Sequence, residues 1–264
     1  MNKIMILSQL QFFKENSEKI TCLTAYDASF AKLFDKCGVD MILVGDSLGN
    51  VIQGSQNTLS VTMQDMIYHT QAAAKGVQNA LLIADMPYQS YTNAEQTLKN
   101  AERLMSAGAH MIKFEGGSEH ETSFKLLQAN NIPVCGHLGL QPQSVVEMGG
   151  YKVQGKDEQS AQRILKDAKM LESWGVKTIV LECMPANLAS KISKTISIPT
   201  IGIGAGVGCD GQVLVSYDML GINTGYLPKF VKNFLTGNDS IESAVKDYIN
   251  SVKSQNFPND EYSY

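Results

Sequence analysis

The chain has 264 residues, 22 of them basic and 26 acidic, so its formal net charge is −4 at pH 7. Charged residues make up only 18% of it, against about 25% in an average globular protein, which leaves more of the chain for packing or subunit contacts. This composition excludes a wholly disordered chain. Because no stripe of lysine and arginine accompanies the acidic balance, it also excludes nucleic acid or anionic lipid as the main partner.

Targeting segments are not evident. No stretch approaches the roughly 20 apolar residues needed to cross a bilayer, and the first residues lack the apolar run and cleavage site of a signal peptide. We therefore expect a cytoplasmic protein without membrane contact. The cysteines are odd in number and show no CxxC spacing, so we expect free thiols, buried or half-buried. They are Cys22, Cys37, Cys135, Cys183 and Cys209.

Short aliphatic and β-branched runs alternate with segments of helical periodicity along the whole chain. Eight runs predict strands, at 19–27, 39–47, 80–87, 110–116, 132–139, 178–185, 199–206 and 212–220. Five periodic segments predict helices, at 28–37, 62–75, 93–107, 119–130 and 158–174. Glycine directly after three of these helices is typical of helix C-termini.

Near-continuous apolar strands that alternate with amphipathic helices indicate parallel strands buried on both faces. Eight of them predict an α/β fold, a (β/α)8 TIM barrel that spans residues 1–264 as a single domain. An extra N-terminal helix at about 3–16 would plug one end, and a helical segment is expected at about 229–253. An open doubly wound sheet is the alternative.

Three connections depart from the simple repeat. Only 207–211 separates the last two strands, which is too short for a helix. A long glycine-containing insertion, 140–157, follows the fifth strand. The polar segment 49–62 after the second strand is a candidate lid.

Polar side chains interrupt the apolar strands repeatedly at their C-terminal ends, where a barrel collects its catalytic groups. They are Asp27, Asp46, Ser47, Asp85, Lys113, Glu115, His137 and Glu182. A buried carboxylate is costly unless it is paired or binds a metal, so this recurrence predicts a site. Each residue taken alone is equally consistent with a salt bridge or a turn.

The acidic members form an oxygen-rich set that suits Mg²⁺ better than zinc or copper. The ammonium of Lys113 among these carboxylates suggests that the substrate is an anion. Two other roles for Lys113 are open, an ion pair with Glu115 or a neighbour and a Schiff base with a carbonyl substrate. Glu182 in an apolar run suits proton abstraction, although a hydrogen-bonded structural role is also open. His137 fits either a hydrogen-bonding or a proton-carrying role. The glycine-rich segment 202–206 indicates close backbone approach rather than a nucleotide loop.

Several longer motifs closely resemble the ketopantoate hydroxymethyltransferase family. They are 43–49 (LVGDSLG), 62–70 (TMQDMIYHT), 85–91 (DMPYQSY), 113–117 (KFEGG), 136–140 (GHLGL), 149–155 (GGYKVQG) and 202–215 (GIGAGVGCDGQVLV). The resemblance runs from about residue 19 to residue 232. It implies hydroxymethyl transfer from 5,10-methylenetetrahydrofolate to 3-methyl-2-oxobutanoate, which gives 2-dehydropantoate in the biosynthesis of pantothenate, the precursor of coenzyme A.

The resemblance also implies roles for individual residues. Asp46 and Asp85 would bind Mg²⁺, and Glu115 would complete the metal site directly or through water. The oxo acid would be held by Asp46, Ser47, Asp85 and Lys113, and Glu182 would accept the proton. Members of the family form large homo-oligomers, so a decamer is expected.

Two other functions remain open at this stage. One is a Mg²⁺-dependent C–C lyase that acts on a 2-oxo acid, of the phosphoenolpyruvate/pyruvate barrel type; such an enzyme usually carries a catalytic cysteine or acid on a mobile loop, and no cysteine stands in 49–62. The other is a barrel that binds a metabolite without catalysis, which would have little reason to align a base with a metal and a lysine.

Overall fold

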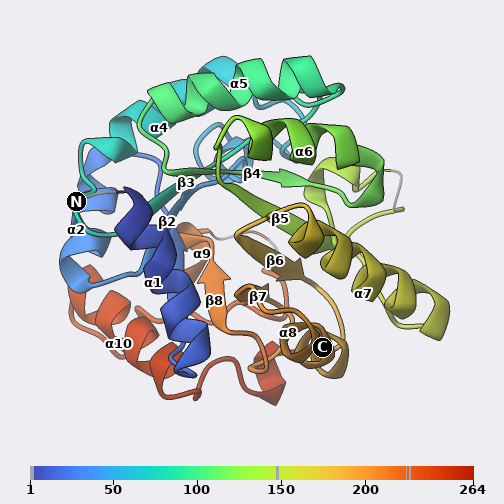
Figure 1. The fold of residues 1–264 in the computed structure, drawn as a ribbon. Helices are drawn as coiled ribbons and strands as arrows, with labels where there is room; N and C mark the ends of the chain where they lie inside the picture. Colours follow the sequence, from blue (N-terminus) through green and yellow to red (C-terminus); the bar gives the residue numbers. More distant parts are fainter. Residues whose placement is uncertain (1–2, 147–148, 224, 226) are drawn as a thin grey trace.

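A computed structural model describes residues 3–264 except 147–148, 224 and 226. Eight parallel strands form a closed barrel in sequence order (Figure 1). They are β1 (Ile20–Thr24), β2 (Met41–Val44), β3 (Leu81–Asp85), β4 (Met111–Glu115), β5 (Val134–Gly139), β6 (Thr178–Glu182), β7 (Thr200–Ile203) and β8 (Gly211–Leu214). The predicted barrel is confirmed. The open sheet is wrong, because β8 closes on β1 with Ile20 paired to Gly211.

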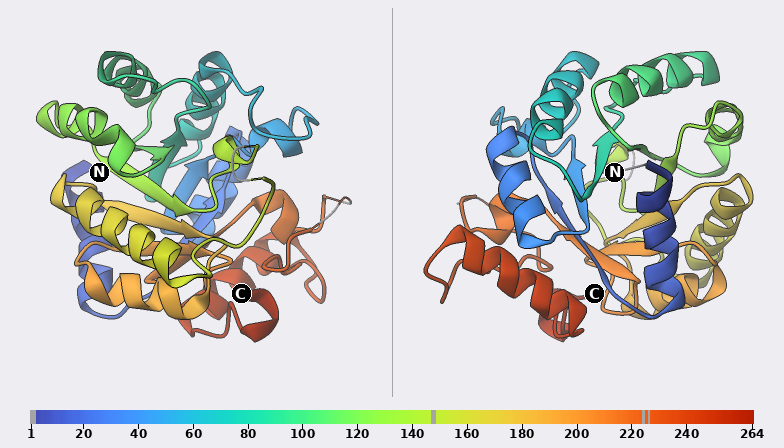
Figure 2. Two further views of the ribbon diagram at one scale, coloured as in Figure 1. Left: turned by 90° about the vertical axis from the view of Figure 1, so that its right-hand side faces the viewer. Right: turned by 60° about the vertical axis from the view of Figure 1, so that its left-hand side comes forward.

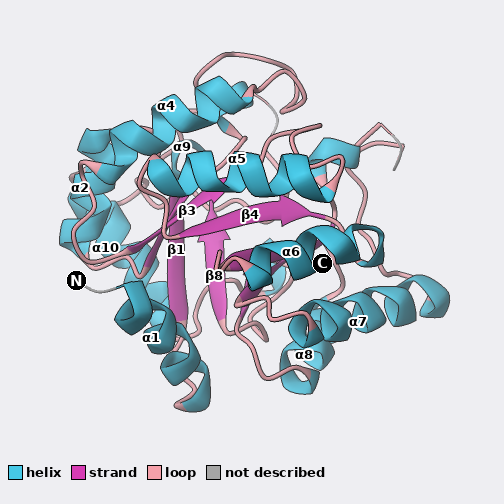
Figure 3. Ribbon diagram, turned by 45° about the horizontal axis from the view of Figure 1, so that its top comes forward, coloured by secondary structure: helices cyan, strands magenta, loops and turns pink. Residues whose placement is uncertain are grey.

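Helices wrap the barrel and cover the outer face of its strands (Figure 3). They are α1 (Lys3–Glu15), α2 (Ala28–Cys37), α3 (Leu48–Val51), α4 (Met63–Ala74), α5 (Ala94–Ser106), α6 (Glu121–Ala129), α7 (Glu158–Ser173), α8 (Ala186–Thr195), α9 (Ser216–Met219) and α10 (Ile241–Lys253). The 3₁₀ turns are η1 (Ser118–His120), η2 (Pro142–Ser144) and η3 (Asp260–Tyr262). Side-chain caps at Asp27, Thr62, Asn93, Asp157 and Ser240 begin five of the helices.

The strands are buried on both faces, as the continuous apolar runs predict. Every strand residue is buried except Glu182, the last residue of β6, which is half-buried. Gly136 in β5 allows close packing of the outer layer, because a Cβ there would lie 2.8 Å from Cδ1 of Leu171 in α7. The one strand position that is not fully enclosed therefore carries an ionisable group.

The irregular connections are as short or as long as expected. No helix separates β7 from β8, and 204–210 crosses in turns and bends. In the insertion after β5, which ends at Gly139, the turn η2 begins at Pro142.

The C-terminal helical segment is shorter than the prediction of 229–253. Helix α10 begins only at Ile241, and 229–240 contains turns and bends without a helix. The assignment of the whole chain to one domain stays a prediction.

Helix α1 covers the N-terminal end of the barrel, as the sequence predicts (Figure 2). The ammonium of Lys14 donates to the carbonyl oxygens of Ser193 (2.8 Å) and Ile198 (3.0 Å) and to Oδ2 of Asp210 (2.8 Å). Asp210 also accepts from the amide and hydroxyl of Thr200 at the start of β7. One lysine thus fastens α1 to the segments that precede β7 and β8.

We expect Lys14→Met to lower the free energy of unfolding by about 1.5–3 kcal/mol, the range for hydrogen bonds to charged groups. The pair with Asp210 is largely shielded, with 14% and 19% of the two side chains exposed. Lys36→Met is the matched control, because its pair with Glu242 is 70% and 38% exposed, and solvent screens exposed pairs so that they contribute little to stability. Urea denaturation measures both, and equal losses would contradict the role given to Lys14.

The sequence also led to expectations about membrane-spanning segments and about the cysteines. Within the described ranges no helix is long and apolar enough to cross a membrane. All five cysteines are free thiols; Cys37 is half-buried and the other four are buried, as expected.

Candidate active site

The expected site residues gather at the C-terminal end of the barrel, opposite α1. Asp85, Glu115 and Glu182 are the last residues of β3, β4 and β6, and Lys113 lies two residues before Glu115. Asp46 and Ser47 follow β2. The long connections after β2, β5 and β8 extend at this end, on the right of the left-hand view in Figure 2. The barrel therefore brings together polar groups that lie far apart in the sequence.

Strand register explains the first charged contact. Asp85 of β3 is paired in register with Lys113 of β4, and the Lys113 ammonium lies 2.8 Å from Oδ1 of Asp85. Burial alone lowers the pKa of Lys113, but the charges of Asp85, Asp46 and Glu115 outweigh burial and raise it. Lys113 is therefore held as an ammonium, which disfavours the Schiff-base alternative.

Asp46 lies against this pair from the neighbouring strand. Its amide donates to Oδ2 of Asp85 at 3.1 Å, and only 5% of the residue is exposed. Burial, and then repulsion from Asp85 and Glu115, raises the pKa of Asp46 to about 8. A Cβ on the preceding Gly45 would lie 2.8 Å from Oγ of Ser47, so a side chain there would displace the Ser47 hydroxyl. Asp85 and Glu115 thus disfavour a third negative charge at Asp46, although the Lys113 ammonium lies nearby.

His137 of β5 stands between two of the carboxylates. Its Nδ1 lies 3.4 Å from Oε1 of Glu115, and its Nε2 lies 3.1 Å from Oε2 of Glu182. Both nitrogens are buried without a well-directed hydrogen bond in the described part of the chain. Burial and the Lys113 charge lower the pKa of His137, but Glu115 and Glu182 raise it to about 9. His137, whose role the sequence left open, bridges Glu115 to Glu182.

The carboxylates fit a divalent cation in chemistry but are not yet arranged around one. Oδ1 of Asp85 is buried and lies 2.8 Å from the Lys113 ammonium, and the part of the chain that the structure describes gives it no directed hydrogen bond. Hard oxygen donors with unneutralised charge suit Mg²⁺. Among the described residues, however, no three histidine, cysteine or acidic side chains form a ready-made metal site. The metal ligands Asp46, Asp85 and Glu115 therefore stay a prediction.

The two remaining strand-end polar residues behave differently. The Ser47 hydroxyl lies 2.9 Å from the hydroxyl of Tyr26, beside the cluster. Asp27 instead caps α2, because its Oδ1 accepts from the amides of Ser29 and Phe30. Ser47 thus stays a candidate substrate contact, whereas the structure gives Asp27 a role at the start of a helix.

Gln143 is a site residue that the sequence reasoning missed. It lies in η2 and is 5% exposed, and it contacts Asp46, Glu115 and Tyr91. Burial, and then the negative charges of Glu182, Asp46 and Glu115, raise the pKa of Tyr151. Tyr151 therefore lies near the cluster, although 60% of the residue is exposed. Neither residue interrupts an apolar strand, so the strand-end pattern held no signal for them.

The glycines of 202–206 serve packing within the chain. Gly204 and Gly206 adopt positive φ angles of 60° and 79°. A Cβ on Gly204 would lie 2.6 Å from the ring of Phe230, and one on Gly206 would lie 2.4 Å from Cβ of Ala186. The expected close backbone approach is thus confirmed, and it is an approach to the chain's own segments.

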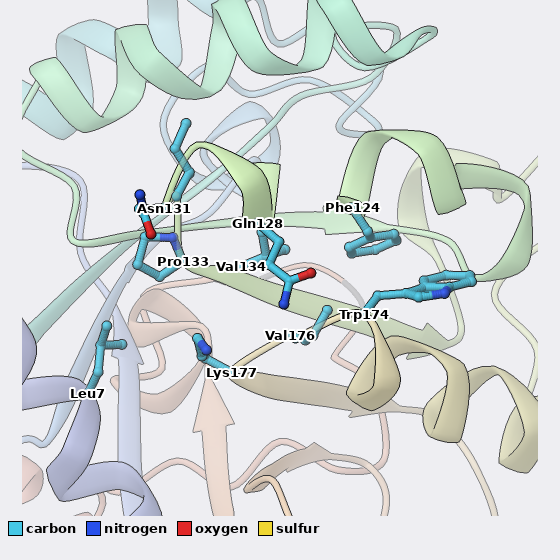
Figure 4. A pocket seen from close by; sticks show the side chains of 11 residues that line it. Leu7, Phe124, Gln128, Asn131, Pro133, Val134, Trp174, Val176 and Lys177 are labelled. Atoms are coloured by element: carbon cyan, nitrogen blue, oxygen red, sulfur yellow. The ribbon is translucent and has the colours of Figure 1, made fainter. Parts of the chain in front are cut away.

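A pocket of about 390 Å³ lies at the other end of the barrel (Figure 4). Leu7 of α1, Gln128 at the end of α6, and the residues before β5 and β6 line it, with Phe124 and Trp174 at one side. None of the expected site residues contributes to it. Catalytic groups of (β/α)8 barrels lie at the C-terminal face, so this pocket is not the candidate active site.

Solved structures of similar fold support the architecture alone. A putative phosphonomutase from Burkholderia cenocepacia superposes with a TM-score of 0.67 and 10% identity, over 84% of this chain and 95% of that one. Phosphonopyruvate hydrolase, in a complex with oxalate and Mg²⁺, superposes with a TM-score of 0.61 and 14% identity, over 81% of both chains.

Sequence relatives are much closer. A protein of Ruthia magnifica named 3-methyl-2-oxobutanoate hydroxymethyltransferase is 68% identical over 260 residues, which cover 98% of this chain and all of the relative. Its namesake from Aeromonas salmonicida is 52% identical over the full length of both chains. The sequence profile of ketopantoate hydroxymethyltransferase matches residues 4–260. The chain belongs to the ketopantoate hydroxymethyltransferase family.

Proposed function

We propose that the chain transfers a hydroxymethyl group from 5,10-methylenetetrahydrofolate to 3-methyl-2-oxobutanoate and releases 2-dehydropantoate and tetrahydrofolate. The reaction supplies pantothenate, the precursor of coenzyme A. One observation carries the proposal beyond family membership. A lysine paired with a carboxylate, and a half-buried glutamate linked to the same cluster through His137, share one end of the barrel.

The anionic substrate would bind beside Lys113, whose ammonium supplies positive charge in a buried place. Asp46, Asp85 and Glu115 would hold Mg²⁺, with Glu115 bound directly or through water. A bound Mg²⁺ acts as a Lewis acid that polarises the 2-oxo group and so acidifies the neighbouring C–H. Ser47, with its hydroxyl fixed by Tyr26, would add a hydrogen bond to the oxo acid together with Asp46 and Asp85.

Glu182 would remove the proton from C3 of the oxo acid. Its position is half-buried, so the carboxylate would be open to a bound substrate, and His137 Nε2 lies 3.1 Å from its Oε2. The electron pair of the broken C–H bond would form the new bond from C3 to the methylene carbon of the folate, while one of the two bonds from that carbon to a folate nitrogen breaks. Water would then add its hydroxyl group to the methylene carbon as the second carbon–nitrogen bond breaks. The two nitrogens would take up the C3 proton and the remaining proton of water, which releases tetrahydrofolate.

The reaction is tested by mixing the chain with 3-methyl-2-oxobutanoate, Mg²⁺ and methylenetetrahydrofolate and analysing the products. We expect 2-dehydropantoate in amounts equal to the tetrahydrofolate formed. Thorough chelation of the metal should abolish turnover, and added Mg²⁺ should restore it. Cleavage of a 2-oxo acid without folate would instead support the C–C lyase, and binding without exchange of the C3 proton would support a metabolite-binding barrel.

The family resemblance also bears on the location, the co-substrate and the assembly of the protein. We infer a cytoplasmic enzyme with methylenetetrahydrofolate as co-substrate and a homo-oligomer, expected to be a decamer. The low charged fraction of 18% agrees with buried subunit surface. Sedimentation of the purified chain tests the assembly, and a monomer at all concentrations would contradict it.

A further inference from the structure

We propose that Gln143 is a positioning residue of the proposed metal site, because its hydrogen bonds restrain the carboxylates of Asp46 and Glu115, which would bind the cation. The inference rests on the proposed metal site and adds a residue to it. It starts from a contrast in the cluster. Asp85 has Lys113 as a partner of opposite charge, and Oε1 of Glu115 faces His137 at 3.4 Å. Asp46 and Oε2 of Glu115 instead accept hydrogen bonds from Gln143, which is neutral, and the two acidic residues are 5% and 3% exposed.

That neutral partner uses its backbone N–H and both ends of its side-chain amide. The backbone N–H of Gln143 donates to Oε2 of Glu115 at 3.0 Å. Its side-chain Nε2 donates to Oδ2 of Asp46 at 2.7 Å and to the carbonyl oxygen of Met86 at 3.0 Å. Its Oε1 accepts from the hydroxyl of Tyr91 at 2.5 Å. One residue after β5 therefore joins the ends of β2, β3 and β4.

The orientation of the Gln143 amide is determined by these partners. If the amide were turned over, Oε1 would face the carbonyl oxygen of Met86, which only accepts hydrogen bonds. Tyr91 reinforces the observed orientation from the other side, because its hydroxyl donates to Oε1. The ring of Tyr91 is itself held against Phe114, with 5.1 Å between the ring centroids. The donor end of Gln143 is thus directed at Asp46 before any ligand arrives.

The hydrogen bonds engage one oxygen of each carboxylate. Gln143 contacts Oδ2 of Asp46 and Oε2 of Glu115. The other oxygen of Glu115, Oε1, lies 3.4 Å from Nδ1 of His137. Carboxylates that bind metals are commonly held in this way by outer hydrogen bonds, whose loss costs about 10–100-fold in metal affinity or activity. The opposite possibility is that the Gln143 amide occupies the place of the cation, and its removal would then strengthen binding.

The two possibilities predict changes of opposite sign in metal affinity. We expect Gln143→Met, which keeps the length of the side chain but has no donor, to weaken binding of Mn²⁺ to the substrate-free protein by about 10–100-fold. Calorimetry or the electron paramagnetic resonance of free Mn²⁺ measures this without turnover. The KM for the oxo acid should rise in parallel. Unchanged or tighter Mn²⁺ binding would overturn the proposal.

Gln141→Met is the matched control, because it makes the same chemical change two residues earlier. Gln141 is half-buried and donates to the backbone oxygen of His137 at 3.4 Å, not to a carboxylate. Its Mn²⁺ affinity should stay within about twofold of the wild type. If the wild type itself bound no Mn²⁺, the proposed metal site would fail, whereas wild-type binding matched by Gln143→Met refutes the role of Gln143 alone.

Tyr91→Phe provides a second route to the same conclusion and keeps Gln143 in place. The substitution removes only the hydroxyl that fixes Oε1. We expect Mn²⁺ binding to weaken several-fold, less than in Gln143→Met, while the melting temperature reports whether the fold is kept. Should Gln143→Met not fold, Tyr91→Phe decides, and wild-type Mn²⁺ affinity in that variant overturns the proposal.

Discussion

Replacing Glu182 by glutamine is expected to lower turnover by about 10²–10⁴-fold, the range that one general base contributes. Glutamine keeps the shape of the side chain but cannot take up the C3 proton. The affinity for the oxo acid should change little, because the substrate's charge would be met by Lys113 and the metal. Steady-state kinetics and the dissociation constant of the oxo acid measure the two effects separately.

Proton exchange tests the same role without folate. In D₂O the wild type should exchange the C3 hydrogen of 3-methyl-2-oxobutanoate for deuterium, and Glu182→Gln should not. Glu182→Asp is a second variant to compare, because it keeps the carboxylate but shortens the side chain by one methylene. We expect this variant to exchange the C3 hydrogen more slowly than the wild type. Exchange at the wild-type rate in Glu182→Gln would assign the base to another group, of which His137 at 3.1 Å is the nearest candidate.

The strands were predictable from their apolar pattern, and their number favoured a barrel; the pairing of β8 with β1 decides against the open sheet. Parallel strands buried on both faces appear as continuous apolar runs, and each polar interruption is therefore conspicuous. The same logic located Asp46, Asp85, Lys113, Glu115 and Glu182. Once the strands pair in order, contacts such as Asp85 with Lys113 follow from register alone.

Asp27 shows where the strand-end pattern is ambiguous. An aspartate after a strand and before a helix satisfies two descriptions, a group in the barrel mouth and a helix N-cap. The structure decides for the cap at α2. In a (β/α)8 barrel both roles occur at the same end, so composition and spacing cannot separate them; the direction of the side chain does.

Gln143 shows a different limit. It is brought to the carboxylates by the path of the chain after β5, where Gly139 with φ of 98° lets the backbone pass close to Glu182. A glutamine in a loop has no periodicity and no charge to mark it. Its contacts with Asp46 and Glu115 depend on three-dimensional geometry that no local pattern encodes, and the same holds for the hydroxyl of Tyr91.

Replacing Asp85 by asparagine should abolish metal-dependent binding of the oxo acid, with metal affinity reduced by more than the roughly 100-fold typical of an outer partner. Asparagine keeps the size of the side chain and can still accept from the Asp46 amide, but it removes the charge 2.8 Å from Lys113. Calorimetric titration with Mg²⁺, with and without oxo acid, measures the loss. Unaltered metal-dependent binding would remove Asp85 from the site.

The stability of Asp85→Asn separates a metal ligand from a structural ion pair. Removing one partner of an isolated buried pair costs about 3–5 kcal/mol. Lys113 keeps Asp46 and Glu115 nearby, and the crowding of negative charge is relieved, so the loss in unfolding free energy should fall below that range. Asp27→Asn is the matched control, because asparagine caps a helix as well as aspartate does, and it should leave both metal binding and stability unchanged. A loss of activity in Asp85→Asn with stability close to the wild type therefore indicates that the charge of Asp85 serves the cation and the substrate more than the fold.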